Sequence, residues 1–185
     1  MATKKTTKLA ENIEASETAK KAVDKKVQRR IPLDIEVPCV CNTKGQLGYI
    51  SSRSNGINAD WDEFGSVQYL DLRELVNMRN TQKRFFNDNW IVLRDTDDGE
   101  FTADEIYKFL RVDDKYGSYY DCDNIETFFD LSPKQMKEKV ATLSDGIKEL
   151  LTIMACDKFE SGEIDSIKKT QAIKDALGIK DDEGE

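Results

Sequence analysis

Hydrophobic and polar positions alternate with a period of two in the segment 32–41. Its apolar residues Leu33, Ile35 and Val37 would share one face of a strand. Because Pro38 has no N–H to donate, we expect this strand to lie at a sheet edge or to carry a bulge. Further strands are predicted for short apolar runs at 47–52, 57–61, 66–70 and 90–93, and turns for 42–45, 54–56 and 62–65. The pattern indicates a small antiparallel β-meander, sheet-like or barrel-like.

A helical period interrupts this meander before its last strand. Asp71 is followed three residues later by Glu74, a variant of the capping box, and apolar residues then recur at helical spacing. We therefore predict one helix over 71–88, with Phe86 on its buried face and Phe85 pointing elsewhere. The strands and this helix together form a predicted β unit of residues 31–94.

The remaining chain, residues 95–179, is predicted to be helical. Thr102 and a glutamate three residues later cap one helix, and a short helix follows Asn124. Ser132 begins another, with proline in its first turn and a capping-box glutamine, and Gly178 ends the last. The sequence therefore predicts an α+β protein, in which a small antiparallel β unit with a capped helix precedes a helical C-terminal region.

One apolar stripe in the helical region has two interpretations. Its residues recur at steps of four and three, and the segment 144–146 divides the stripe into two helices. The favoured interpretation is an amphipathic helix pair packed on the β unit, and the alternative is an intermolecular coiled coil. In the alternative, four residues of the stripe contact a partner: Leu143, Ile147, Leu150 and Met154.

Charge is divided unevenly along the chain. Residues 1–30 hold nine Lys or Arg and four Asp or Glu, a net charge of +5, which leaves −13 for residues 31–185 of the total of −8. We expect this basic arm to be flexible or to be ordered by a partner, and the tail 180–185 to be acidic and mobile. The predicted contact residues of the arm are Lys4, Lys5, Lys8, Lys20, Lys21, Lys25, Lys26, Arg29 and Arg30.

Candidate chemistry changes this picture little. The chain has no histidine, which removes the commonest general base and transition-metal ligand. Cys39 and Cys41 share a strand face and are expected to be buried thiols, with a disulfide or metal site as the alternative. Carboxylates beside Trp61 could suit a sugar, but acidic clusters are common in so acidic a chain. The loop 95–100 departs from the EF-hand spacing, so we expect a solvated acidic turn.

Basic residues interleaved with aromatic ones occur at 79–90. This pattern is typical of single-stranded nucleic-acid binding, although packing of one phenylalanine with solvated basic neighbours is the favoured interpretation. No glycine-rich phosphate loop or serine elbow is present in the sequence. We therefore expect a non-enzymatic protein without cofactor, metal, small-molecule ligand or membrane segment.

The motifs of residues 30–178 resemble a family. They are Trp61-Asp62-Glu63-Phe64-Gly65, Glu74-Leu75, Met78-Arg79-Asn80, and Phe85-Phe86 with Asn89-Trp90. In this order they resemble small, poorly characterised proteins encoded among the virion structural and assembly genes of large tailed bacteriophages. The resemblance implies a virion protein made in the bacterial host cytoplasm, which assembles as a homo- or hetero-oligomer with other virion proteins in the head, neck or tail.

Two alternative functions remain open at this point. The basic arm could bind nucleic acid, because the acidic body is repelled by phosphate while the arm is attracted to it. Alternatively, the acidic body could inhibit an intracellular factor of the host. Both alternatives, like the virion hypothesis, place function in binding.

Overall fold

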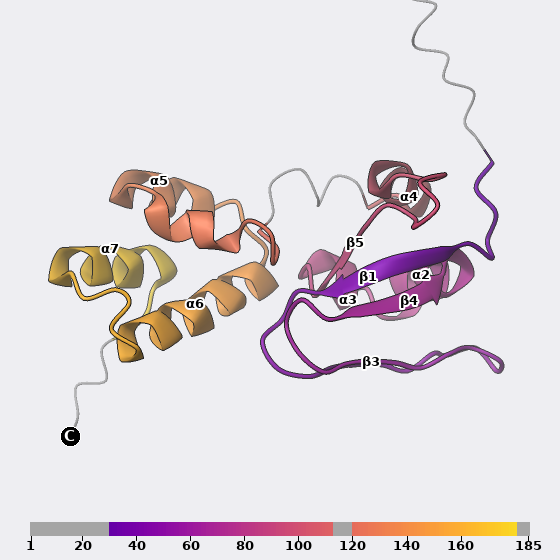
Figure 1. Cartoon of the computed structure of the whole chain (residues 1–185), viewed down its shortest axis with the longest axis horizontal. Helices are drawn as coiled ribbons and strands as arrows, with labels where there is room; N and C mark the ends of the chain where they lie inside the picture. Colours follow the sequence, from indigo (N-terminus) through magenta and orange to yellow (C-terminus); the bar gives the residue numbers. More distant parts are fainter. Residues whose placement is uncertain (1–29, 113–119, 181–185) are drawn as a thin grey trace, which may run out of the picture. The chain divides into compact units, whose positions relative to one another are not determined.

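The structure is a computed structural model in which residues 30–112 and 120–180 are described (Figure 1). The chain divides into residues 1–31 and a compact unit of residues 32–185. The predicted arm apart from Arg30, most of the predicted tail, and residues 113–119 lie outside the described residues. All helices and strands named below belong to the second unit.

A three-stranded antiparallel sheet in the order β4-β1-β5 forms the centre of the β unit. Strand β1 (Glu36–Cys41) pairs on one side with β4 (Val67–Asp71) and on the other with β5 (Ile91–Leu93). Cys39 and Cys41 lie on one face of β1 and are fully buried free thiols, as expected for small residues on a covered sheet face. Burial raises the pKa of the Cys39 thiol, which therefore stays protonated.

Pro38 lies inside this central strand, so the prediction of an edge position or a bulge is wrong. The register between β1 and β4 runs without interruption from Glu36 to Val40. The carbonyl oxygen of Pro38 accepts from the backbone N–H of Arg94 at 3.0 Å, so the side of Pro38 that lacks a donor faces β5. β5 pairs only with Cys39 to Cys41, and the missing N–H therefore lies where that ladder ends.

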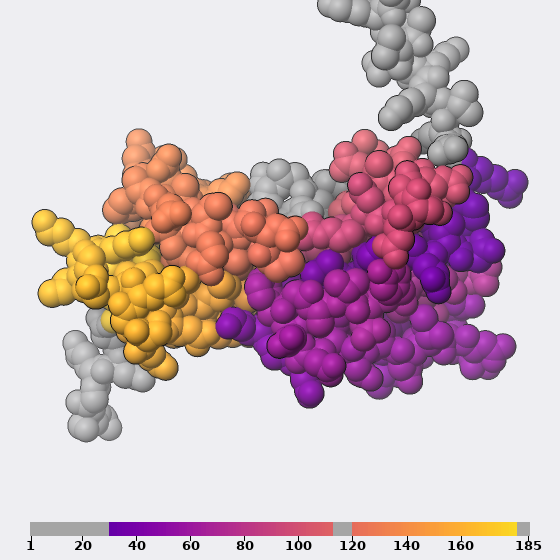
Figure 2. Space-filling model, in the orientation of Figure 1, coloured from indigo at the N-terminus to yellow at the C-terminus, as the bar shows by residue number. Residues whose placement is uncertain are grey.

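The turn after β1 leads into a separate two-stranded hairpin of β2 (Leu47–Tyr49) and β3 (Ala59–Trp61). The buried Trp61 indole donates through Nε1 to the carbonyl oxygen of Cys39 at 2.8 Å, which fastens the hairpin to the sheet. Figure 2 shows the outer surface of the β unit in indigo and magenta.

The predicted helix 71–88 is two helices, α2 (Leu72–Thr81) and α3 (Arg84–Asn87). Asp71 caps α2 as predicted, since its carboxylate accepts from the Glu74 N–H at 2.5 Å. The break falls at Gln82, whose backbone leaves the helical region with φ −132° and ψ 60°. The short helix α3 then buries both Phe85 and Phe86, which corrects the expectation that Phe85 points elsewhere.

Helix α4 (Ala103–Leu110) follows β5 and packs against it. Its capping box, formed by Thr102 and Glu105, is present as predicted. The Tyr107 hydroxyl accepts from the backbone N–H of Leu93 at 2.6 Å, which satisfies a donor on the outer side of β5. The helix therefore covers a sheet edge that would otherwise be open.

The described residues 120–180 contain a 3₁₀ helix and three α-helices. They are η2 (Ile125–Asp130), α5 (Pro133–Val140), α6 (Asp145–Glu160) and α7 (Ile167–Leu177). The predicted capping box of α5, the break before α6 and the glycine end of α7 are confirmed. These helices bury their own apolar cluster, against which Phe64 of the β unit packs. The predicted α+β class is confirmed.

Candidate functional site

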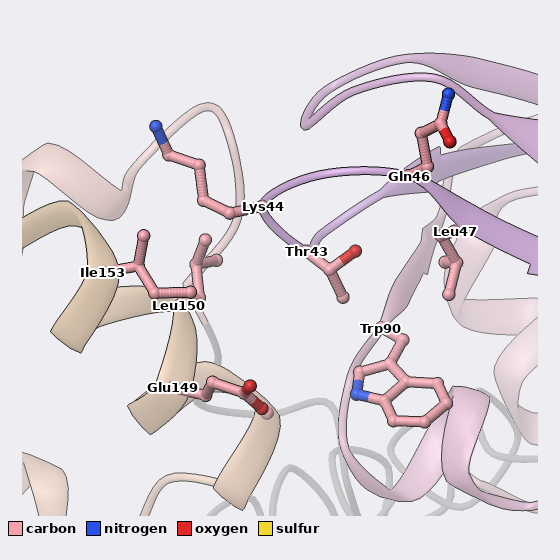
Figure 3. Close-up of a pocket in the computed structure, with 9 residues that line it drawn as sticks. Thr43, Lys44, Gln46, Leu47, Trp90, Glu149, Leu150 and Ile153 are labelled. Carbon is pink, nitrogen blue, oxygen red and sulfur yellow. The ribbon is translucent and has the colours of Figure 1, made fainter.

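A pocket of about 210 Å³ lies between the segment that follows β1 and helix α6 (Figure 3). Leu47 and Trp90 form part of its wall on the β side, and Leu150 and Ile153 on the helix side. Figure 3 shows the carboxylate of Glu149 and the indole nitrogen of Trp90 pointing toward one another across the pocket. The site therefore combines apolar walls with one acidic group and one N–H donor.

Close packing at the start of α6 holds the two sides of this pocket together. The backbone at Gly146 approaches the Asp88 carbonyl so closely that an added Cβ would fall on that oxygen. The hydroxyl of Ser144, the residue that caps α6, donates to the same carbonyl at 3.2 Å. Glycine at position 146 is therefore required by a close approach of two backbones rather than by a turn.

Trp90 is held at the pocket by its neighbours in the β unit. Its ring makes an edge-on contact with Phe85, at 5.6 Å between ring centroids. The Arg84 guanidinium lies 4.5 Å from the centroid of the Trp90 ring and pairs with Asp88 at 2.8 Å. One face of the indole is thus already occupied by a cation, while the indole nitrogen is directed into the pocket.

Most charges near the pocket are paired. Lys44 binds Asp157 at 3.0 Å, and Lys148 binds Asp145 at 3.2 Å. Figure 3 shows the Lys44 ammonium directed away from the middle of the pocket. Glu149 is exposed and has no ion-pair partner among residues 30–112 and 120–180. The charge that this pocket offers to a ligand is therefore negative.

A second polar cluster joins the β2–β3 hairpin to α2 around the carboxylate of Glu74, which is 1% exposed. Its Oε1 accepts from the Tyr49 hydroxyl at 2.6 Å, from the Ser51 hydroxyl, and from Asn77 Nδ2 at 3.1 Å. Its Oε2 pairs with Arg53 Nη1 at 2.9 Å. Three of the four donors belong to the β2–β3 hairpin and the fourth to α2, so the carboxylate links the hairpin to the helix.

These partners determine the ionisation of the cluster. Burial acts to raise the pKa of Glu74, but hydrogen bonds from Ser51, Tyr49 and Asn77 and the charge of Arg53 outweigh it, and the pKa is lowered. Burial, followed by the hydrogen bond to Glu74, raises the pKa of Tyr49 to about 12. Glu74 is therefore an anion and Tyr49 a neutral donor at neutral pH.

Stability should consequently fall in acid through Glu74. Because its pKa is lower in the folded chain than in the unfolded chain, its contribution is complete above about pH 4.3 and is lost as the pH falls through the folded pKa. We expect urea midpoints measured from pH 7 to pH 3 to fall less steeply for Glu74→Gln than for the unchanged chain. Parallel curves for the two proteins would contradict the assignment.

A third set of contacts joins the β unit to the C-terminal helices. The buried side chain of Asn42 donates through Nδ2 to the carbonyl oxygens of Asn89 at 3.1 Å and Tyr120 at 3.0 Å. Arg94 pairs with Asp121 at 2.9 Å and with Asp123 at 2.5 Å. These bonds give the second unit a polar connection between its two apolar regions.

The predicted contact residues have different outcomes. Arg30 is exposed, and the other basic residues of the set lie outside the described residues. Leu143, Ile147, Leu150 and Met154 are between 0% and 8% exposed and belong to the core of the helical region. Their assignment as contact residues is corrected, because the apolar stripe faces the chain's own η2, α5 and α7 and is already covered. Leu150 alone reaches the wall of the pocket.

The other sequence candidates have structural roles. Trp61 is buried, whereas its carboxylate neighbours Asp60, Asp62 and Glu63 are exposed. In the loop 95–100, the carboxylate of Asp98 accepts from a hydroxyl and a backbone N–H of the loop itself. Within the described part of the chain, no group of three or more Cys, Asp or Glu side chains is arranged to hold a metal ion.

Sequence reasoning missed the acidic residues at these sites. Glu74 had a signal, because it lies on α2 one turn before the buried Met78 and so on the apolar side of an amphipathic helix. No sequence pattern singled out Glu149, because an exposed glutamate in a helix is ordinary. Only the neighbouring β unit gives its side chain a pocket to face.

Comparison of the chain with protein-family models, curated proteins and solved structures finds no match. Among the described residues, no helix has the length and apolar character required to cross a membrane.

Proposed function

We propose that this chain is a non-enzymatic structural or assembly component of a tailed-bacteriophage particle, located in the head, neck or tail and acting through protein–protein contacts. The observation that carries the proposal is the division of charge into a basic segment of +5 and a following body of −13. Segments of opposite sign on one chain favour association between chains. The motif resemblance to phage virion and assembly proteins supplies the setting.

The construction of the body supports this role. The Glu74 cluster, the Asn42 bonds and the Arg94 ion pairs each join separate elements of the second unit. Such cross-connections suit a part that must keep its shape while neighbours bind to it. A basic segment that becomes ordered on a neighbour then adds contact area without enlarging the folded body.

Mass spectrometry of purified particles tests the proposal. We expect peptides of the chain to co-purify with phage particles at a constant ratio to the major capsid protein, because a structural component has a fixed copy number. Repeated absence from particles and from assembly intermediates would overturn the proposal.

Nucleic-acid binding by the arm is the second candidate, and the same +5 charge favours it. This candidate predicts that the chain binds DNA and RNA, and that its affinity for them falls as the salt concentration rises. Binding that weakens steeply with salt and that disappears on removal of residues 1–29 would favour this candidate over protein assembly.

A further inference from the structure

The pocket at α6 holds an acidic side chain whose charge nothing described balances. Glu149 faces Trp90 across a space walled by Leu47, Leu150 and Ile153, while the neighbouring acids Asp88, Asp145 and Asp157 are each paired with a basic residue. We propose that this pocket receives a lysine side chain from residues 1–29 of a second copy of the chain. The inference rests on the proposed assembly function and names its partner and its site.

The chemistry of the pocket fits a lysine. A lysine has an apolar stem of four carbons and a charged end, so it can lie along Leu150 and Ile153 while its ammonium reaches the Glu149 carboxylate. An arginine fits less well, because the Arg84 guanidinium already occupies a face of the Trp90 ring. At about 210 Å³ the pocket is smaller than the roughly 300–1,000 Å³ of small-molecule sites and suits one side chain.

The occupant follows from charge and from chain length. Seven of the nine basic residues in 1–30 are lysines, and this segment is the part of the chain with a net positive charge. Fully extended, its 29 residues outside the described structure reach at most about 100 Å, which is enough to cross to a neighbouring molecule. Two bodies of −13 repel one another, and a basic segment placed between them offsets that repulsion.

Self-association of the full chain tests the site. In sedimentation velocity at low salt, we expect Glu149→Gln to weaken self-association about tenfold, because the lysine would lose its charged acceptor. The matched control is Glu160→Gln, which removes the same charge from an exposed position at the end of the same helix, outside the pocket. The control should associate like the unchanged chain.

Equal effects of the two substitutions, or no effect of Glu149→Gln, would overturn the inference. A chain that stays monomeric at every concentration would also overturn it. In each of these cases the virion proposal stands or falls separately, on whether the chain is found in particles.

Cross-linking in a mixture of ¹⁴N- and ¹⁵N-labelled chains shows whether the lysine at Glu149 comes from the same chain or from a second copy. A carbodiimide joins a carboxylate to an amine that touches it, so we expect Glu149 to be joined to lysines of the segment 1–29. Peptide pairs of mixed label show contacts between copies. Glu149 cross-links found only in same-label pairs would mean docking within one chain and would overturn the assignment to a second copy.

Discussion

Replacing Glu74 with alanine should lower the free energy of unfolding by about 3 kcal/mol or more. The carboxylate is 1% exposed and accepts hydrogen bonds from Tyr49, Ser51 and Asn77 besides pairing with Arg53. Its removal leaves the buried Tyr49 hydroxyl and the charge of Arg53 without their acceptor, and it opens a small cavity. The cost therefore exceeds that of an ordinary surface ion pair.

Urea denaturation of the unchanged chain and of the Glu74→Ala variant measures this loss of stability. Glu63→Ala is the control, because Glu63 is an exposed acid in the turn after β3, and its loss should change stability by less than about 0.5 kcal/mol. A cost below about 1 kcal/mol for Glu74→Ala would show that the hairpin does not depend on this cluster.

Replacing Gly146 with alanine should also destabilise the chain, by about 1–3 kcal/mol or more. The sign of this change in the free energy of unfolding is informative, because exchanging glycine for alanine within a helix normally stabilises a protein by roughly 0.5–1 kcal/mol. Here the new Cβ would fall on the Asp88 carbonyl oxygen and within 3.0 Å of its carbon. Both are backbone atoms, so α6 and the α3–β5 corner must move apart.

Thermal unfolding by calorimetry, with Glu160→Ala as an exposed control in the same helix, checks this prediction. The separation should also alter the environment of Trp90, which is visible in its fluorescence. A Gly146→Ala chain as stable as the parent, with unchanged fluorescence, would contradict the close approach.

Elements whose signals are local could be predicted from the sequence. The capping boxes at Thr102 and Ser132 and the glycine end of α7 depend on residues within one or two turns, and all three are present. The divided helix 71–88 was not predicted, because no local signal marks the break at Gln82, after which the short helix α3 buries both Phe85 and Phe86 in a core that distant residues build. Local propensity gives way to packing at such positions.

Local sequence patterns also could not predict which strands pair with one another or where the pocket lies. Pro38 favoured an edge strand, but the structure places it in the central strand at the point where pairing with β5 ends. The pocket depends on contact between Gly146 and Asp88, which lie far apart in sequence. A period of seven in the stripe through Leu143 and Ile147 indicates only that one face is buried. It does not say whether the same chain or another covers that face, and here the same chain does.

Quantitative mass spectrometry of gradient-purified phage particles tests the central claim most directly. Particles from infections that produce the full chain should contain it at a constant ratio to the capsid protein. Particles from infections that produce only residues 30–185 should be depleted of it, because that variant keeps the acidic body but lacks the basic segment. A chain that remains in the soluble fraction in both infections, and is absent from particles and assembly intermediates, would contradict the account.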